Sequence, residues 1–161
     1  GRTCICKCCN VCSAKEMFEA VKERAQEQDI IIKAAAVADY RPKHIRGSKM
    51  KKTEDGSDLT LELERTDDIL AYLGARQKQG QFLCGFAMET EDLIANAKRK
   101  LEKKRLDMIA ANSLRVEGAG FGGNTNVVTV ITKEKEVSLG KMTKEETAAE
   151  LLTMIAEARK V

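Results

Sequence analysis

The side chains best suited to chemistry in this sequence are lysines, and they are concentrated in two short segments. Residues 41–53 contain six Lys or Arg and no acidic residue, and residues 98–105 contain six Lys or Arg and one Glu. The formal net charge of the whole chain is only +3, so the remaining residues are net acidic. Positive charge segregated in this way fits a concentrated anionic ligand such as a polyphosphate, and it also fits a solvated basic face.

Lys100 and Lys104 have the most informative spacing of these lysines. Side chains four residues apart on a helix lie on one face, about 6 Å apart. Two ammonium groups at that distance repel each other by roughly a few tenths of a kcal/mol unless an anion or acidic side chains compensate them. The pair therefore either contacts phosphate or belongs to a solvated basic stripe.

Four helices are predicted from capping residues that precede apolar side chains at helical spacing. Two of them begin with capping boxes, in which Ser13 and Thr143 are followed three residues later by Glu16 and Glu146. The predicted helices are one from the Ser13 cap to about residue 28, one over 69–78 after the cap at 66–68, one capped by 90–92 that ends near Arg105, and a C-terminal helix from Thr143.

The strands are predicted from two kinds of apolar pattern. Continuous apolar runs without polar alternation predict buried strands, parallel in type, at residues 29–37, 82–87 and 106–111. Residues 59–63 (LTLEL) alternate, which predicts a strand with one face in water, and residues 127–131 with 137–139 predict a hairpin.

Buried strands that alternate with helices predict a single α/β domain over residues 1–161. Its sheet is expected to be Rossmann-like, open and mostly parallel, flanked by helices, with the hairpin at one edge. Ligands of such sheets bind at the carboxyl ends of the strands, a rule that selects Ala38 and Asp39, residues 85–87 around Phe86, and Asn112. Asp39 either binds a ligand or caps a loop, and Phe86 either packs against a nucleoside or belongs to the core.

Several classes of protein are disfavoured by the sequence. No apolar run approaches the ~20 residues of a membrane-spanning helix, and the basic segments lack the interleaved aromatic side chains of nucleic-acid-binding surfaces. Residues 118–123 satisfy the pattern G-x-G-x-x-G, but they precede a predicted strand and not a helix, so the dinucleotide fingerprint is rejected. The sequence therefore predicts neither a membrane nor a nucleic acid as partner.

Five of the six cysteines lie within the first twelve residues, and the sixth is Cys84. Cys9 and Cys12 have the spacing of half a zinc site, but no second pair follows and His44 is the only histidine. No metal ligands are assigned, and a thiolate metal site is retained as an alternative. Reduced thiols are consistent with a reducing compartment, which predicts a cytoplasmic location.

Several motifs resemble those of the phosphopantothenoylcysteine synthetase family, whose bacterial members are usually fused behind a flavin-dependent decarboxylase. Residues 34–42 (AAAVADYRP) and 49–52 (KMKK) are similar to the family's AAVADYRP and KIKK segments. Residues 66–69 (TDDI) resemble its N-P-D-I segment, and residues 85–90 (GFAMET) resemble its GFAAET segment. The resemblance covers about residues 10–160.

The resemblance implies a CTP-dependent phosphopantothenate–cysteine ligase of coenzyme A biosynthesis. The carboxylate of 4′-phosphopantothenate attacks the α-phosphorus of CTP and releases pyrophosphate, and the amine of L-cysteine then displaces CMP to form an amide. It also implies Mg²⁺ as the accompanying cation, no FMN in this domain, a flavin decarboxylase domain in the parent protein, and a homodimer. Residues 59–63 and 127–131 are expected to be its contact edges.

The resemblance also assigns a set of residues to the nucleotide by their positions in the motifs. Lys49 is expected to have a catalytic role and to close over the nucleotide as part of a mobile flap. The residues implied to bind nucleotide are Ala34, Ala35, Asp39, Lys49, Asp67, Asp68, Ile69, Leu70, Phe86, Lys100 and Lys104.

Residues 1–12 depart from the family pattern. The family's first strand, a glycine-containing turn and an Asn-containing segment are expected before residue 10, where this sequence reads GRTCICKCCN. The expectation is therefore a truncated start, and an alternative function is that of a catalytically incomplete CTP-binding fragment. Such a fragment would bind CTP without releasing pyrophosphate.

Overall fold

The computed structural model describes residues 7–45, 47–51, 58–89, 92–113 and 124–159. The glycine-rich segment 118–123, the capping residues Thr90 and Glu91, and Cys4 and Cys6 lie outside the described residues. Within the described ranges, no helix has the length and apolar character to cross a bilayer. The same part of the chain brings no three His, Cys, Asp or Glu side chains together as metal ligands.

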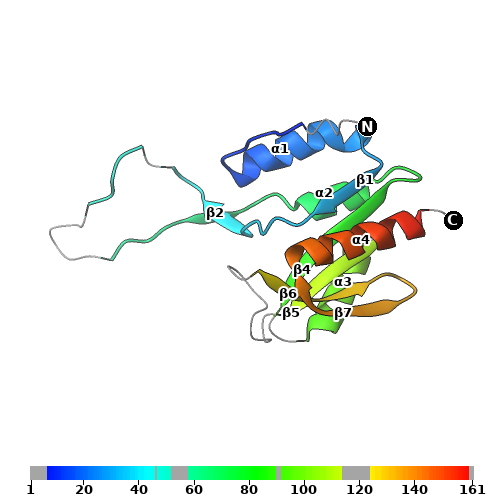
Figure 1. Ribbon diagram of the computed structural model, residues 1–161. Helices are drawn as coiled ribbons and strands as arrows, with labels where there is room; N and C mark the ends of the chain where they lie inside the picture. The colour runs from blue at the N-terminus through cyan, green and yellow to red at the C-terminus, as the bar shows by residue number, and fades with distance from the viewer. Residues whose placement is uncertain (1–6, 46, 52–57, 90–91, 114–123, 160–161) are drawn as a thin grey trace.

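A five-stranded sheet forms the centre of the fold, with strand order β1-β4-β5-β6-β7 (Figure 1). Its strands are β1 (Ile30–Lys33), β4 (Phe82–Glu89), β5 (Met108–Ser113), β6 (Thr125–Ile131) and β7 (Glu136–Thr143). β1, β4 and β5 are parallel, β6 is antiparallel to β5, and β7 is antiparallel to β6. In this sheet every strand except β6 runs in one direction, which confirms the predicted open, mostly parallel α/β sheet with a hairpin at its edge.

Helices cover both faces of the sheet. They are α1 (Ala14–Arg24), α2 (Ile69–Ala75), α3 (Leu93–Lys103) and α4 (Lys144–Ala158), with a 3₁₀ turn over Ala25–Glu27. Successive residues of β4 point to opposite faces, since Leu83 packs in the cluster of Leu73 and Leu101 whereas Cys84 packs in the cluster of Leu151. The central strands are therefore buried on both sides, as their continuous apolar runs predicted.

Capping residues begin most helices where the sequence predicted them. The Thr143 Oγ1 accepts the Glu146 N–H at 3.1 Å while Glu146 Oε2 accepts the Thr143 N–H at 2.8 Å, which completes the predicted capping box. Ser13 Oγ likewise accepts the Glu16 N–H at 3.2 Å, but Glu16 Oε2 accepts the Cys12 N–H at 2.8 Å and not that of Ser13, so this predicted capping box is only half formed. Asp92, in contrast, has left-handed backbone (φ 47°) and makes no capping hydrogen bond, so this part of the predicted cap at 90–92 is wrong.

A two-stranded antiparallel ribbon leads away from the main sheet (Figure 1). It pairs β2 (Tyr40–Pro42) with β3 (Leu63–Arg65), and the described residues 40–45, 47–51 and 58–65 are called the arm below. Two strand predictions are corrected here: β1 ends at Lys33 and not at residue 37, and residues 59–63 enter a strand only at their last position. The three leucines of 59–63 are each more than half exposed, so their alternation does not mark a buried face.

The hairpin of β6 and β7 ends the main sheet. β6 pairs with β5 on one side and with β7 on the other. The expectation that residues 127–131 form a contact edge is therefore wrong, because their strand is internal and β7 is the outermost strand of the hairpin.

Candidate functional site

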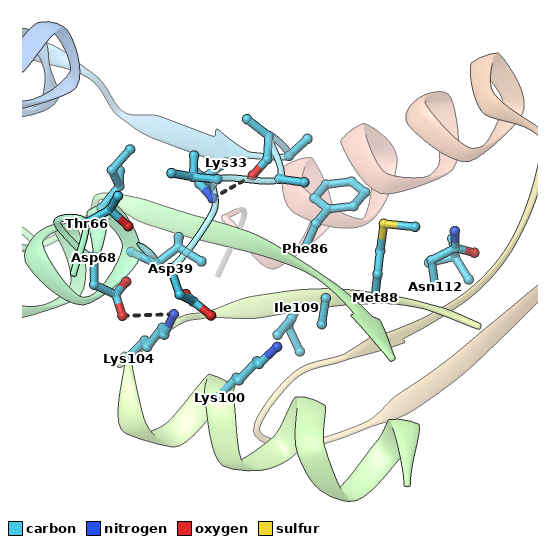
Figure 2. A pocket seen from close by; sticks show the side chains of 18 of the residues that line it. Lys33, Asp39, Thr66, Asp68, Phe86, Met88, Lys100, Lys104, Ile109 and Asn112 are labelled. Atoms are coloured by element: carbon cyan, nitrogen blue, oxygen red, sulfur yellow. Dashed lines mark hydrogen bonds and ion pairs between the residues drawn. The ribbon is translucent and has the colours of Figure 1, made fainter. Parts of the chain in front are cut away.

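A pocket of about 560 Å³ opens at the carboxyl ends of the parallel strands (Figure 2). Asp39, Phe86 and Asn112, which the strand-end rule selected, all line it. So do the residues that the resemblance assigned to a nucleotide, with the exception of Lys49: Ala34, Ala35, Asp39, Asp67, Asp68, Ile69, Leu70, Phe86, Lys100 and Lys104. The fold thus brings together segments that are up to 111 residues apart in sequence (Lys33 and Lys144).

The inner end of the pocket is basic. Lys100, in the last turn of α3, and Lys104, its C-cap, both extend into it, on the one helix face that their spacing predicted. The Lys104 side chain is 22% exposed, and its Nζ lies 3.1 Å from Asp68 Oδ2. The two lysines therefore belong to a concave, partly desolvated wall and not to an open basic stripe.

Asp68 organises this end of the pocket from the start of α2. Its Oδ1 accepts the Ala71 N–H at 3.0 Å, and its Oδ2 faces Lys104. Burial alone would raise the pKa of Asp68, but the Ala71 N–H and the Lys104 ammonium together hold the pKa below its ordinary value. Asp68 thus stays ionised, and its side chain occupies one of the N–H groups that have no partner within the helix at the start of α2.

Lys33 is a pocket residue that the sequence reasoning missed. It is the last residue of β1, and its Nζ donates a hydrogen bond to the Ala35 carbonyl at 2.6 Å (Figure 2). Burial and then the charge of Lys104 lower the pKa of Lys33, against the opposite effect of Asp68 and Asp39. A lysine inside the apolar run of residues 29–37 was the signal that could have revealed it.

The opposite end of the pocket is formed by amide side chains together with Lys144, whose N–H donates to the Asn124 carbonyl at 3.0 Å. Asn112, 6% exposed, accepts the Val127 N–H at 3.3 Å and donates to Asn126 Oδ1 at 3.4 Å, which joins the ends of β5 and β6. Phe86 and Met88 are half-buried on β4 and stand between the asparagines and the lysines (Figure 2). The pocket therefore offers a flat aromatic surface, amide groups and Lys144 at one end, and the ammonium groups of Lys33, Lys100 and Lys104 at the other.

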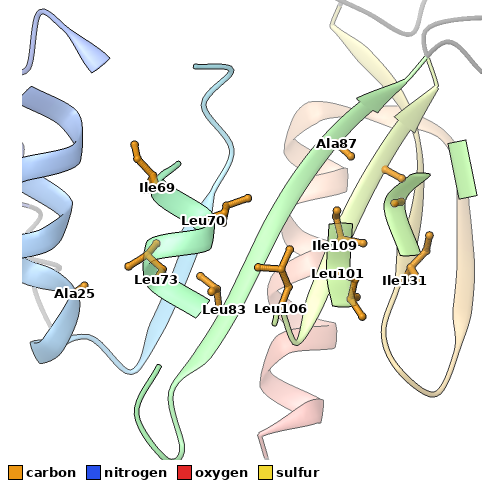
Figure 3. Packing of buried hydrophobic residues seen from close by; sticks show 12 residues of the cluster. Ala25, Ile69, Leu70, Leu73, Leu83, Ala87, Leu101, Leu106, Ile109 and Ile131 are labelled. Atoms are coloured by element: carbon orange, nitrogen blue, oxygen red, sulfur yellow. The ribbon is translucent and has the colours of Figure 1, made fainter. Parts of the chain in front are cut away.

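A hydrophobic cluster behind the pocket fixes the two helices that supply its charges (Figure 3). Leu70 and Leu73 of α2 pack with Leu101 of α3 and with the strand residue Leu83. α2 also approaches the end of α3 closely at Gly74, where an added Cβ would lie 1.8 Å from the Lys104 carbonyl oxygen. The position of Lys104 is thus set by tight packing.

Lys49 is placed elsewhere. It is exposed on the arm, outside the residues that line the pocket, and Figure 1 shows that the arm extends away from the body of the protein. The two residues that flank the arm, Asp39 and Thr66, line the pocket, and the Thr66 N–H donates to the Asp39 carbonyl at 2.9 Å. The role of Lys49 at the nucleotide stays a prediction.

Comparison with known proteins places this arrangement in a family. The family described as the DNA/pantothenate metabolism flavoprotein C-terminal domain matches residues 3–158. The chain belongs to this family. The recognition made from the motifs of residues 34–42, 49–52, 66–69 and 85–90 is confirmed.

Individual relatives agree with this assignment. The chain is 42% identical over 146 residues to the coenzyme A biosynthesis bifunctional protein CoaBC of Vibrio vulnificus (strain YJ016), covering 91% of this chain and 36% of the relative. It is 46% identical over 149 residues to the protein of the same name from Bacillus subtilis (strain 168), covering 92% of this chain and 36% of the relative. A crystal structure of the C-terminal domain of a CoaBC protein superimposes with a TM-score of 0.74 at 40% identity, covering 93% of this chain and 66% of that one. The chain thus spans about a third of the length of these two curated relatives.

Proposed function

We propose that this chain catalyses the nucleotide-dependent joining of 4′-phosphopantothenate to L-cysteine in coenzyme A biosynthesis, as a carbon–nitrogen ligase that uses CTP. The observation that carries the proposal is the pocket, in which an aromatic and amide end faces a lysine-rich end at the carboxyl ends of the strands. The relatives named for coenzyme A biosynthesis support the pathway. Neither the pocket nor the names identify the base, so the choice of CTP rests on the sequence resemblance.

The proposed reaction has two steps. The carboxylate of 4′-phosphopantothenate attacks the α-phosphorus of CTP. A bond forms between this phosphorus and a carboxylate oxygen, and the bond between the phosphorus and the pyrophosphate oxygen breaks. The amine of L-cysteine then attacks the acyl carbon, loses a proton and displaces CMP. Both steps leave anionic phosphate products, and they need positioned positive charge more than a general base.

The pocket residues divide this work by position. Lys100 and Lys104 face the triphosphate and stabilise the charge that develops on the departing pyrophosphate. Phe86 packs against the nucleoside, and the backbone at Ala34 and Ala35 lies along the nucleotide. Mg²⁺ fits the same wall, because this ion takes one or two carboxylates together with phosphate oxygens, and Asp39 and Asp67 both line the pocket.

The arm has two proposed roles: it carries Lys49 to the nucleotide, and it forms the contact of a homodimer. Its exposed apolar side chains, Leu59, Leu61 and Leu63 with Tyr40, offer a surface that a second copy of the chain can cover. Lys49 reaches a nucleotide only if the arm folds over a pocket, its own or that of a second subunit. The proposal also includes a flavin decarboxylase domain in the parent protein and no FMN in this domain. It includes a cytoplasmic location as well, which is consistent with the free thiols at Cys8, Cys9, Cys12 and Cys84.

Pyrophosphate release tests the proposal. The chain is incubated with CTP, Mg²⁺, 4′-phosphopantothenate and L-cysteine, and pyrophosphate and the amide product are quantified. Lys104→Met is expected to lower turnover by about 10²–10³-fold, the loss of roughly 2–4 kcal/mol typical of a preorganised charge. Lys22→Met on α1 removes the same charge far from the pocket and is expected to leave turnover unchanged.

The same assay can contradict the proposal in two ways. CTP binding without pyrophosphate release would favour the catalytically incomplete nucleotide-binding fragment. Normal turnover by Lys49→Ala would remove the flap from the mechanism while leaving the pocket in place.

A further inference from the structure

Lys33 and Lys144 line the pocket although no motif assigned them to a ligand, and Lys33 is the one that lies beside Lys104. It is the only charged residue between Asp29 and Asp39, and it ends a strand whose other residues are isoleucines. Its side chain turns back toward the pocket and donates to the Ala35 carbonyl, two residues further along the chain (Figure 2). The Lys33 ammonium is therefore partly removed from water, and the Ala35 carbonyl, a neutral group, is the partner that it gains.

The charges around Lys33 leave its ammonium poorly compensated. Across the described part of the chain, Lys33 makes no ion pair within 4 Å. Lys104 faces it with a like charge, and the carboxylate that would compensate both, Asp68, is already paired with Lys104. Asp39 attracts it more weakly, and Lys100 lines the same pocket. Two further lysines thus share this place with one engaged carboxylate, Asp68, and one more weakly acting carboxylate, Asp39, an arrangement that favours a further anion.

We propose that Lys33 is a third phosphate-binding ammonium of this pocket, which exchanges the Ala35 carbonyl for a phosphate oxygen of the nucleotide. Lys33 comes from the end of β1, whereas Lys100 and Lys104 come from α3, so a polyphosphate between them is held from two elements and not from one helix face. The inference rests on the proposed function for the identity of the ligand, but its chemistry, an ammonium for phosphate, does not depend on the base.

A structural role for Lys33 would give a different result. If the hydrogen bond to Ala35 served only to hold residues 34–36 in place, its loss would lower stability and affect every ligand alike. A phosphate contact instead couples binding to protonation. Because the negative ligand raises the pKa of Lys33 back toward its ordinary value, binding at alkaline pH takes up protons.

The experiment is calorimetric titration of the chain with inorganic tripolyphosphate and with CTP, in buffers of different ionisation enthalpy, from pH 7 to pH 9.5. Lys33→Met keeps the length of the side chain and removes its charge, and we expect it to weaken the binding of both ligands about tenfold or more. Lys33→Arg restores a permanent charge, so it is expected to bind both ligands but to take up fewer protons than the wild-type chain. Lys22→Met is the control for the loss of one positive charge outside the pocket.

The outcomes separate this inference from the proposed function. Wild-type affinity and proton uptake in Lys33→Met would overturn the inference, and so would weaker binding of 4′-phosphopantothenate with unchanged CTP binding. Tripolyphosphate binding that depends on Lys33, in a chain that does not bind CTP, would support the inference and contradict the proposed function. Thermal unfolding tests whether Lys33→Met and Lys33→Arg are folded. If Lys33→Met does not fold, the proton uptake of Lys33→Arg alone decides whether Lys33 contacts phosphate.

Discussion

The pocket wall and the arm both present lysines, but in opposite settings. Lys104 is largely buried, its ammonium faces Asp68, and its carbonyl lies against Gly74. Lys49 is exposed on the arm, where an added Cβ on the nearby Gly47 would have no heavy atom within 4 Å. The difference indicates that the sheet and its helices hold the pocket lysine in place in advance, whereas Lys49, if it acts at the nucleotide as predicted, must be brought there by a ligand or a second subunit.

The largest expected contrast between the two regions is in stability. Leu83→Ala empties a position that is 1% exposed behind the pocket, and it is expected to lower the free energy of unfolding by about 2–5 kcal/mol. Leu61→Ala on the arm removes a side chain that is 54% exposed, and it is expected to change that free energy by at most about 0.5 kcal/mol in the dilute monomer. Urea unfolding measures both, and equal effects would show that the arm is packed as tightly as the core.

A smaller contrast is expected between two glycines. Gly74→Ala places a methyl group against the Lys104 carbonyl, which we expect to cost about 1–3 kcal/mol of stability and to weaken CTP binding as Lys104 shifts. Gly47→Ala meets open space and is expected to change stability by about 0.5 kcal/mol or less. Urea unfolding and calorimetric titration of the two variants provide the measurement. Unchanged CTP binding in Gly74→Ala would mean that the packing of α2 does not position Lys104 for the ligand.

The smallest expected contrast concerns pH. Because the pKa of Asp68 in the folded chain is below its ordinary value of 3.8, Asp68 contributes stability that is fully present above that value and is lost as the pH falls through the folded pKa. Asp68→Asn keeps a capping side chain but removes the charge, so its deficit relative to the wild-type chain should be present at pH 7 and should shrink below about pH 3.8. Asp58→Asn on the arm removes the same charge outside the pocket and should show a smaller deficit at pH 7. Unfolding free energies at several pH values give the result, and a deficit that grows toward low pH would contradict it.

The body of the protein could be predicted from sequence because burial imposes clear patterns. The runs at 82–87 and 106–111 lack polar alternation since β4 and β5 are covered on both faces, and capping boxes place the starts of α1 and α4. The rule that ligands bind at the carboxyl ends of the strands selected Asp39, Phe86 and Asn112 from the sequence, and all three line one pocket.

The arm and Lys33 were harder to predict, for physical reasons. The alternation of residues 59–63 normally marks one buried face, but on the arm the leucines are exposed, and the pattern carries no information about what covers them. β2 is three residues long and contains Pro42, so it is too short to show the alternation of apolar and polar residues by which a strand is predicted. Lys33 sits in an apolar run, where its meaning depends on Lys104 and Asp68, which lie far away in the sequence.

Calorimetric titration of the chain with CTP and with ATP, each with Mg²⁺, tests most directly whether the pocket at the strand ends is a nucleotide site. We predict selective binding of CTP that is weakened by Lys100→Ala and unchanged by Lys22→Met. Absence of binding by either nucleotide, or CTP binding that is indifferent to Lys100→Ala, would contradict the assignment of this pocket.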